Sequence, residues 1–262
     1  MFPFLDLKII KIPMFGLCIL VGLTLASILA YYIIKKQNKC FWDFVIITTV
    51  SLAFGVVFAK LLFIVVTYPI KYFFKIIWLI ISGKEKSLIS GGFVFYGGII
   101  GGIIGAFIGK KIAGCKISDF IDIYGVLIPL VHCFGRLGCF CAGCCYGIRY
   151  DGPFSVVYSN PLSSVPVGVG IFPVQLLESF LLLCLSIFLL VFLLKNKKNI
   201  FCLYLIIYAV IRFFTEMLRF DFERGFIFNI SVSQFISILI IIITVSYLIF
   251  SKITINRKKK LT

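Results

Sequence analysis

The sequence predicts an all-α membrane protein that crosses the bilayer about seven times. Of its 262 residues, 61% are hydrophobic and only 14% are charged, whereas soluble domains carry roughly 25% charged residues. Apolar runs recur from end to end, and a hydrocarbon core of about 30 Å requires roughly 20 such residues per helix. Because no polar linker divides these runs, we expect residues 1–262 to form a single domain.

Seven runs are long enough to span the bilayer: 12–34, 43–66, 91–109, 117–133, 173–194, 200–219 and 229–251. The first run lacks a small-residue cleavage site, so we interpret it as a retained helix and not as a signal peptide. The run 69–81 is apolar but short, and it carries Lys71 and Lys75. It is therefore predicted to be an interfacial or amphipathic segment.

The basic residues predict the orientation of the spans. They gather after spans one, three and five and in the C-terminal tail: Lys35, Lys36, Lys39, Lys110, Lys111, Lys116, Lys195, Lys197, Lys198, Lys252, Arg257, Lys258, Lys259 and Lys260. The positive-inside rule then places the C-terminus in the cytoplasm and the N-terminus outside. The net charge of +16 is explained by this topology, so we expect no nucleic-acid partner.

Small residues mark the third span. They recur at four-residue intervals in two sets, Gly98, Gly102 and Ala106, and Gly101, Gly105 and Gly109. Such spacing allows helices to pack closely. The paired glycines Gly91–Gly92 and Gly97–Gly98, on either side of a polar tyrosine, predict a broken helix or one entered from a loop.

The stretch 131–147, VHCFGRLGCFCAGCCYG, gathers most of the reactive side chains. It holds the single histidine His132, Arg136 and five of the ten cysteines, and the predicted topology places it, with the loop up to residue 172, on the outer side. We favour the cysteines as small apolar fillers around a tight loop. A metal site, a disulfide and a nucleophilic thiol remain alternatives.

Ionisable residues within spans are costly and therefore suggest function. Arg212 and Glu216 lie four residues apart, on one helix face, and Arg219 follows one turn later. One interpretation is a structural ion pair between helices. The other is a site for an anionic head group, in which Glu216 holds the two arginines and Arg136 joins them on the outer side.

Several motifs occur in an order that resembles the prolipoprotein diacylglyceryl transferase family. They are FGLCILVG at 15–22, GGFVFYGG at 91–98, SDF at 118–120, GRLGCFCAGCCYG at 135–147, FPVQLLES at 172–179, IIYAVIRFFTEMLRFD at 206–221 and ISVSQFIS at 230–237. They extend over most of the chain, and the glycine-rich motif at 135–147 is the strongest.

The resemblance implies a multi-pass enzyme of the bacterial cell membrane with its active site toward the outer leaflet. Such an enzyme transfers the diacylglyceryl group of phosphatidylglycerol to the lipobox cysteine thiol of a lipoprotein precursor, and glycerol phosphate is released. We expect a monomer that requires no cofactor and no metal.

The resemblance also implies roles for individual residues. Arg136 is expected to bind the phospholipid, and Arg212 and Glu216 are expected to form the charged catalytic centre. Gln175 and Glu178 are expected to support substrate binding.

Arg219 is placed with these substrate-binding residues, because it continues the charged face that ends the sixth span. Tyr96 stands where the family usually has a histidine, so either Tyr96 or His132 is expected to assist the incoming thiol. Tyrosine, with an ordinary pKa near 10, is a weak base in that role.

Other positions also depart from the family pattern. Phe15 stands where the family usually has tyrosine, and Cys139, Ala142 and Cys144 stand where it has Asn, Asn and Glu. Two alternatives therefore stay open. A divergent member could use another acceptor or use the cysteines between Cys133 and Cys145 in membrane thiol redox chemistry, and a non-enzymatic member could be a lipid-binding subunit.

Overall fold

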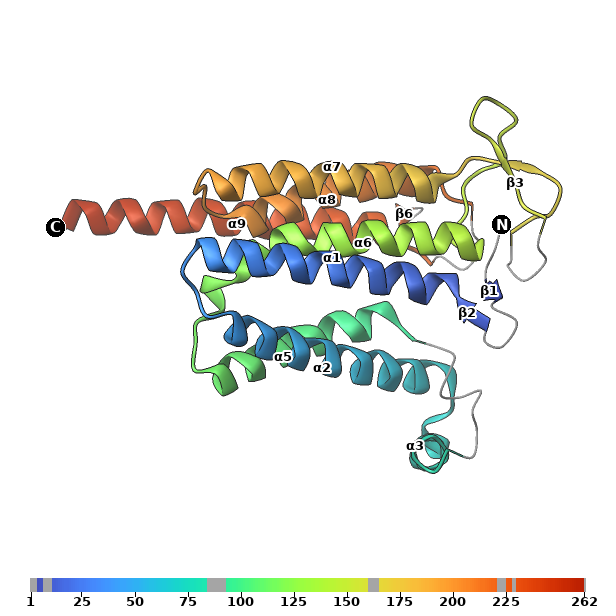
Figure 1. The fold of residues 1–262 in the computed structure, drawn as a ribbon, viewed down its shortest axis with the longest axis horizontal. Coiled ribbons are helices and arrows are strands. Elements are labelled where there is room, and N and C mark those ends of the chain that lie inside the picture. Colours follow the sequence, from blue (N-terminus) through green and yellow to red (C-terminus); the bar gives the residue numbers. More distant parts are fainter. Residues whose placement is uncertain are drawn as a thin grey trace. The chain divides into compact units, whose positions relative to one another are not determined.

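The computed structural model describes residues 4–6, 11–83, 93–159, 165–220, 225–227 and 230–261, and they are almost entirely helical (Figure 1). Seven of the described helices are long and apolar enough to cross a membrane. The prediction of seven spans is therefore confirmed. The described residues group into two compact units, 34–120 and the remainder of the chain, and the prediction of a single domain stays a prediction.

The larger unit contains five of the spanning helices. They are α1 (Met14–Lys36, which passes into the other unit at residue 34), α6 (Ile121–Ala142), α7 (Val174–Leu194), α8 (Ile200–Met217) and α9 (Val232–Leu261). Helix α6 packs against α7 and α8, and α8 packs against α9. Consecutive helices from α6 to α9 run antiparallel, so the end of α6 meets the start of α7 and the end of α8 meets the start of α9.

Close contacts hold α6 to its neighbours at several levels. A Cβ on Gly125 would lie 2.9 Å from the Cα of Phe201 in α8, so the helices can approach only because this residue is glycine. The Phe201 N–H donates to Asp122 Oδ1 at 3.0 Å, and Ser186 Oγ donates to the Val126 carbonyl at 2.9 Å. Asp122 thus satisfies an otherwise unpaired donor in the first turn of α8.

Short antiparallel strand pairs lie at one end of the same unit (Figure 1). They are β1 (Phe4–Asp6) with β2 (Lys11–Pro13), β3 (Val156–Val157) with β4 (Gly170–Ile171), and β5 (Phe226–Ile227) with β6 (Ile230–Ser231). A separate bridge joins Gly147 to Arg219. It ties the segment after α6 to the residue just beyond α8.

The smaller unit pairs α2 (Phe41–Thr67) with α5 (Phe95–Ala113) along a stripe of glycines. The four buried glycines of α5 are Gly97, Gly101, Gly105 and Gly109. A Cβ on Gly101 would lie 2.3 Å from the Phe54 carbonyl oxygen of α2. The predicted packing role is confirmed for the set beginning at Gly101. A Cβ on Gly98 or Gly102, by contrast, would lie 3.8 Å or 3.9 Å from its nearest neighbouring atom, which is an ordinary contact.

Of the two alternatives predicted around Tyr96, the broken helix is wrong for Gly97 and Gly98, whereas a helix entered from a loop agrees with the structure, since residues 93–94 precede α5 without regular structure. Helix α5 begins at Phe95 and runs through both glycines without interruption, because Gly97 serves close packing: its Cβ would lie 2.5 Å from the Phe58 carbonyl oxygen. The other pair, Gly91–Gly92, lies outside the described residues.

The fourth span differs most from its predicted bounds. We expected it over 117–133 followed by a loop, but α6 runs from Ile121 to Ala142 and contains His132 and Arg136. The glycines and cysteines in this part of the chain are helical because α6 packs here against α7, where Arg136 meets Glu178, and against α1, where Gly138 meets Phe15. The segment 69–81 is a 3-10 turn, Ile70–Tyr72, and the nine-residue α3, Phe73–Ile81, which is too short to span a bilayer.

Candidate active site

Glu178 lies at the centre of a buried charged cluster between α6, α7 and α8. Its Oε2 is 2.5 Å from Arg136 Nε, and its Oε1 is 2.7 Å from Arg212 Nη1. Thr215 Oγ1 donates to the same Oε1 at 2.8 Å. Glu178 is only 3% exposed, so one carboxylate joins two arginines from different helices in a site almost closed to solvent.

A second carboxylate extends the cluster toward the end of α8. Glu216, which is 1% exposed, pairs with Arg212 Nη2 one turn away and lies 3.8 Å from Arg219 Nη1. Arg212 Nη2 also donates to Ser233 Oγ of α9 at 3.2 Å. The expectation that Glu216 holds Arg212 and Arg219 agrees with these contacts.

The charges of this cluster do not cancel. Among the described residues it contains three guanidinium groups, from Arg136, Arg212 and Arg219, and two carboxylates, from Glu178 and Glu216. One positive charge remains in a region shielded from water, where an uncompensated charge is costly. The cluster is therefore suited to an anionic ligand with oxygen acceptors, such as a phosphate.

Helix direction explains why residues so distant in sequence meet here. Arg136 lies near the end of α6, Glu178 in the second turn of α7, Arg212 near the end of α8 and Ser233 at the start of α9. Antiparallel neighbours bring these four positions to one end of the unit. The bridge between Gly147 and Arg219 then holds the last arginine beside them.

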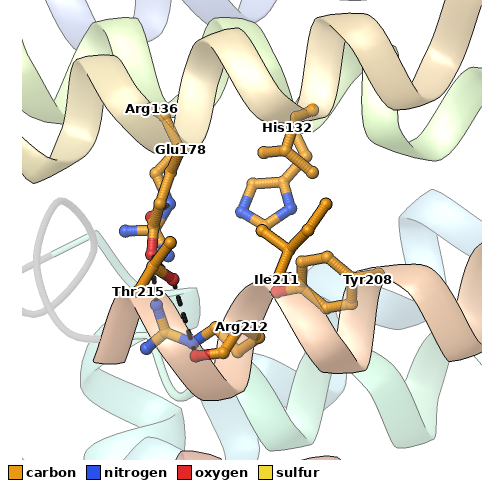
Figure 2. A pocket seen from close by; sticks show the side chains of 8 residues that line it. His132, Arg136, Glu178, Tyr208, Ile211, Arg212 and Thr215 are labelled. Carbon is orange, nitrogen blue, oxygen red and sulfur yellow. Dashed lines mark hydrogen bonds and ion pairs between the residues drawn. The ribbon is translucent and has the colours of Figure 1, made fainter. Parts of the chain in front are cut away.

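His132 lines the same small cavity as the arginines. Figure 2 shows His132 and Arg136 reaching from one side and Tyr208, Arg212 and Thr215 from the other. The His132 and Tyr208 rings meet edge to face, with their centroids 5.5 Å apart. The structure thus brings His132, one of the two predicted candidates for the base, next to the predicted lipid contacts.

Tyr96, the other candidate, lies on α5 in the smaller unit and is 41% exposed. Its role in assisting the thiol stays a prediction.

Gln175 is fully buried but lies outside the ion-pair cluster. Its Nε2 donates to the Cys144 carbonyl at 2.8 Å and to Tyr158 Oη at 3.3 Å. Burial raises the pKa of Tyr158 to about 12. These contacts support a positioning role for Gln175 at the turn that follows α6, whereas direct substrate binding by this residue stays a prediction.

Three cysteines gather where α6 ends. The sulfurs of Cys139, Cys144 and Cys145 all lie within 4.8 Å of one another. Hydrogen bonds from the other two thiols, with the charges of Arg219 and Arg136, lower the pKa of Cys145 well below its usual range. All ten cysteines of the chain are free thiols in this structure, so it does not contain the disulfide that was one of the alternatives.

The sequence interpretation missed three residues of the site. Thr215 and Ser233 hydrogen-bond the central ions, and Tyr208 covers His132. Thr215 and Tyr208 had a usable signal, since they lie three residues after and four residues before Arg212 on the same helix face. Ser233 had no such signal beyond its place in the motif ISVSQFIS, because its contact joins α9 to α8.

Fold and site together define a polytopic membrane protein with a buried arginine–glutamate centre suited to a phosphorylated lipid. The family model described as prolipoprotein diacylglyceryl transferase matches residues 3–250. The chain belongs to this family of transferases.

Relatives that are named phosphatidylglycerol–prolipoprotein diacylglyceryl transferase share much of the sequence. The protein from Clostridium tetani is 35% identical over 238 residues, which cover 89% of this chain and 91% of the relative. A second such transferase from Clostridium perfringens is 36% identical over 184 residues, covering 64% and 69%. The protein from Dehalococcoides mccartyi strain 195 is 27% identical over 250 residues, covering 94% and 90%.

Proposed function

We propose that this protein transfers the diacylglyceryl group of phosphatidylglycerol to the lipobox cysteine of a lipoprotein precursor. The observation that carries the proposal is the buried cluster of three arginines and two glutamates with one positive charge in excess. A phosphodiester supplies the missing negative charge and oxygen acceptors for guanidinium forks. Family membership and the names of the relatives support the same substrates.

The reaction replaces a carbon–oxygen bond with a carbon–sulfur bond. The thiol sulfur attacks the glyceryl carbon that carries the phosphodiester, the C–O bond breaks, and glycerol phosphate leaves with the electron pair. Negative charge grows on the leaving phosphate, so Arg136 and Arg212 stabilise the transition state more than the bound lipid. A base must take the thiol proton, and His132 is a candidate because it lines the same cavity as both arginines.

The charge distribution supports an outer-leaflet site in the bacterial cell membrane. The cluster lies where α6 and α8 end and where α7 and α9 begin, whereas Lys195, Lys197 and Lys198 follow the opposite end of α7. The positive-inside rule assigns those lysines to the cytoplasm. Phosphatidylglycerol would then enter from the outer leaflet, which also agrees with an N-terminus outside the cell.

The test is a transfer reaction with the purified full-length protein in detergent. It contains phosphatidylglycerol and a peptide that ends its apolar stretch in a lipobox cysteine, and it follows the peptide's mass gain and the release of glycerol phosphate. We expect Arg136→Ala and Arg212→Ala to lower the rate at least about 100-fold, as removal of a single transition-state donor does. Arg149→Ala is the matched control, because Arg149 is exposed on a neighbouring segment of the same unit.

No mass gain with the folded wild-type protein would refute the proposal for this acceptor. Equal losses in all three arginine variants would refute the specific role of the buried cluster. Transfer to a different thiol, with none to the lipobox peptide, would instead support the alternative of a divergent member with another acceptor.

A further inference from the structure

The three cysteines at the end of α6 have no part in the transfer scheme. Cys139 lies on the last turns of α6, and Cys144 and Cys145 lie in the turn that follows it. Their sulfurs all fall within 4.8 Å of one another. Three thiolates bound to one tetrahedral zinc ion, with Zn–S bonds of about 2.3 Å, lie about 3.8 Å apart, so side-chain rotations alone could bring these sulfurs onto a common ion.

The backbone returns the chain toward the helix so that the thiols converge. Gly143 and Cys145 adopt left-handed conformations, with φ of 73° and 56°, which end the helix and reverse the chain. The Cys144 N–H donates to the Cys139 carbonyl at 3.1 Å. A left-handed conformation is uncommon for a residue other than glycine, and here it places adjacent cysteines beside the same helical partner.

Contacts from other elements fix this turn from outside. The Cys144 carbonyl accepts from the buried Gln175 of α7 at 2.8 Å, and the Phe220 N–H donates to the Tyr146 carbonyl at 3.2 Å. The thiol arrangement is therefore built by several segments of the fold and does not depend on one turn alone.

The thiolate is the form that binds metals, and two guanidinium groups lie near the cluster. Arg136 and Arg219 both interact electrostatically with Cys145. Three thiolates and one divalent ion together carry a single negative charge, which lies beside these two arginines. Sulfur-only ligands select soft or borderline ions such as Zn²⁺ over Mg²⁺ or Ca²⁺.

We infer that Cys139, Cys144 and Cys145 form a three-thiolate site for a soft divalent metal ion of the Zn²⁺ class. The fourth coordination position goes to water or to an added ligand. The bound ion joins the turn 143–145 to α6 and so holds in place the chain that bears Arg136. This inference does not rest on the transferase activity.

The first measurement is metal binding by the full-length protein in detergent, reduced and freed of metal, with Cd²⁺ as the probe. We expect one ion per chain and a thiolate-to-metal charge-transfer absorption that saturates at that ratio. Cys139→Ser and Cys145→Ser should each weaken binding more than about 100-fold, because even changes beyond the direct ligands cost 10–100-fold. Cys184→Ser is the matched control, since Cys184 is exposed on α7 and should leave binding unchanged.

Alkylation of the wild-type protein tests the same site without any variant. We expect Cd²⁺ to protect Cys139, Cys144 and Cys145 from a thiol reagent, whereas the exposed Cys40 reacts equally with and without the ion. Any of three results would overturn the inference. They are the absence of charge-transfer absorption, equal reactivity of the three thiols with and without Cd²⁺, and undiminished affinity in both Cys139→Ser and Cys145→Ser. The inference would also be overturned, in favour of a redox pair, if the protein purified without reductant carries a disulfide among these cysteines and binds no ion once it is reduced.

Discussion

Replacement of Glu178 by glutamine tests whether the stability of the charged cluster and the positioning of Arg136 both depend on this carboxylate. Glu178 is the only described carboxylate that pairs with Arg136, and it also accepts from Arg212 and Thr215. The amide keeps the shape and one oxygen, so Arg212 and Thr215 can still donate to it. Its NH₂ group, however, would face Arg136 Nε, and the cluster would then hold three guanidiniums and one carboxylate.

The expected cost follows from burial. Removing one partner of a buried ion pair costs about 3–5 kcal/mol, and we expect the lower end because the glutamine oxygen retains two of the contacts. If the same 3 kcal/mol is lost from positioning Arg136 in the transition state, the rate of transfer falls about 100-fold. Thr215→Val, which removes one hydrogen bond to the same carboxylate, should cost less than Glu178→Gln in both respects.

Two assays measure these effects on the same preparations. Thermal unfolding in detergent ranks the stabilities of wild type, Thr215→Val and Glu178→Gln, and the transfer reaction ranks their rates. A Glu178→Gln protein with the wild-type unfolding midpoint and the wild-type rate would show that Arg136 does not depend on this carboxylate. The interpretation that Glu178 both stabilises the cluster and positions Arg136 would then be wrong.

Three further predictions concern the elements around the cluster. Gly147→Ala should destabilise the protein and lower transfer, because its Cβ would lie 2.4 Å from the Phe172 carbonyl oxygen and disturb the bridge to Arg219; unfolding midpoint and rate together check this. Gly101→Ala should lower the unfolding midpoint more than Gly102→Ala, since a Cβ at Gly101 would lie 2.3 Å from a backbone oxygen and one at Gly102 3.9 Å away. Burial raises the pKa of Tyr158 to about 12, so the stability it contributes is complete below pH 10 and is lost as pH rises toward 12; unfolding of Tyr158→Phe should depend less on pH in that range.

The number of spans and most of their bounds could be predicted because they depend on local composition. Apolar length alone identifies a helix such as α7, which we expected at 173–194 and which runs over 174–194. The end of α6 could not be predicted in this way. Glycines and cysteines have weak helix propensity, so the helix over residues 134–142 depends on tertiary contacts, such as those of Arg136 with Glu178 of α7 and of Gly138 with Phe15 of α1.

The charged residues of the site could be predicted from the sequence, but the contacts between them could not. Charges inside apolar runs identified Arg212 and Glu216, and helical spacing correctly placed them on one face. Glu178 was expected only to support substrate binding, since an acid near the start of a helix is also explained by the helix dipole. Its contact with Arg136 joins residues 42 positions apart, and no local pattern reports such a distance.

The arrangement of the three arginines explains how the cluster can bind an anion while its own ion pairs stay formed. Glu178 engages Arg136 through Nε and Arg212 through Nη1, while Glu216 engages Arg212 and, at the longer distance of 3.8 Å, Arg219. Arg212 therefore pairs each of its two Nη groups with a different carboxylate and links the two. Arg136 contacts Glu178 through Nε, so its two Nη groups keep donors that this carboxylate does not use. A phosphate that enters beside Arg136 can accept those donors without breaking either ion pair of Arg212, and Arg212, held in place by both carboxylates, adds its positive charge to the same site.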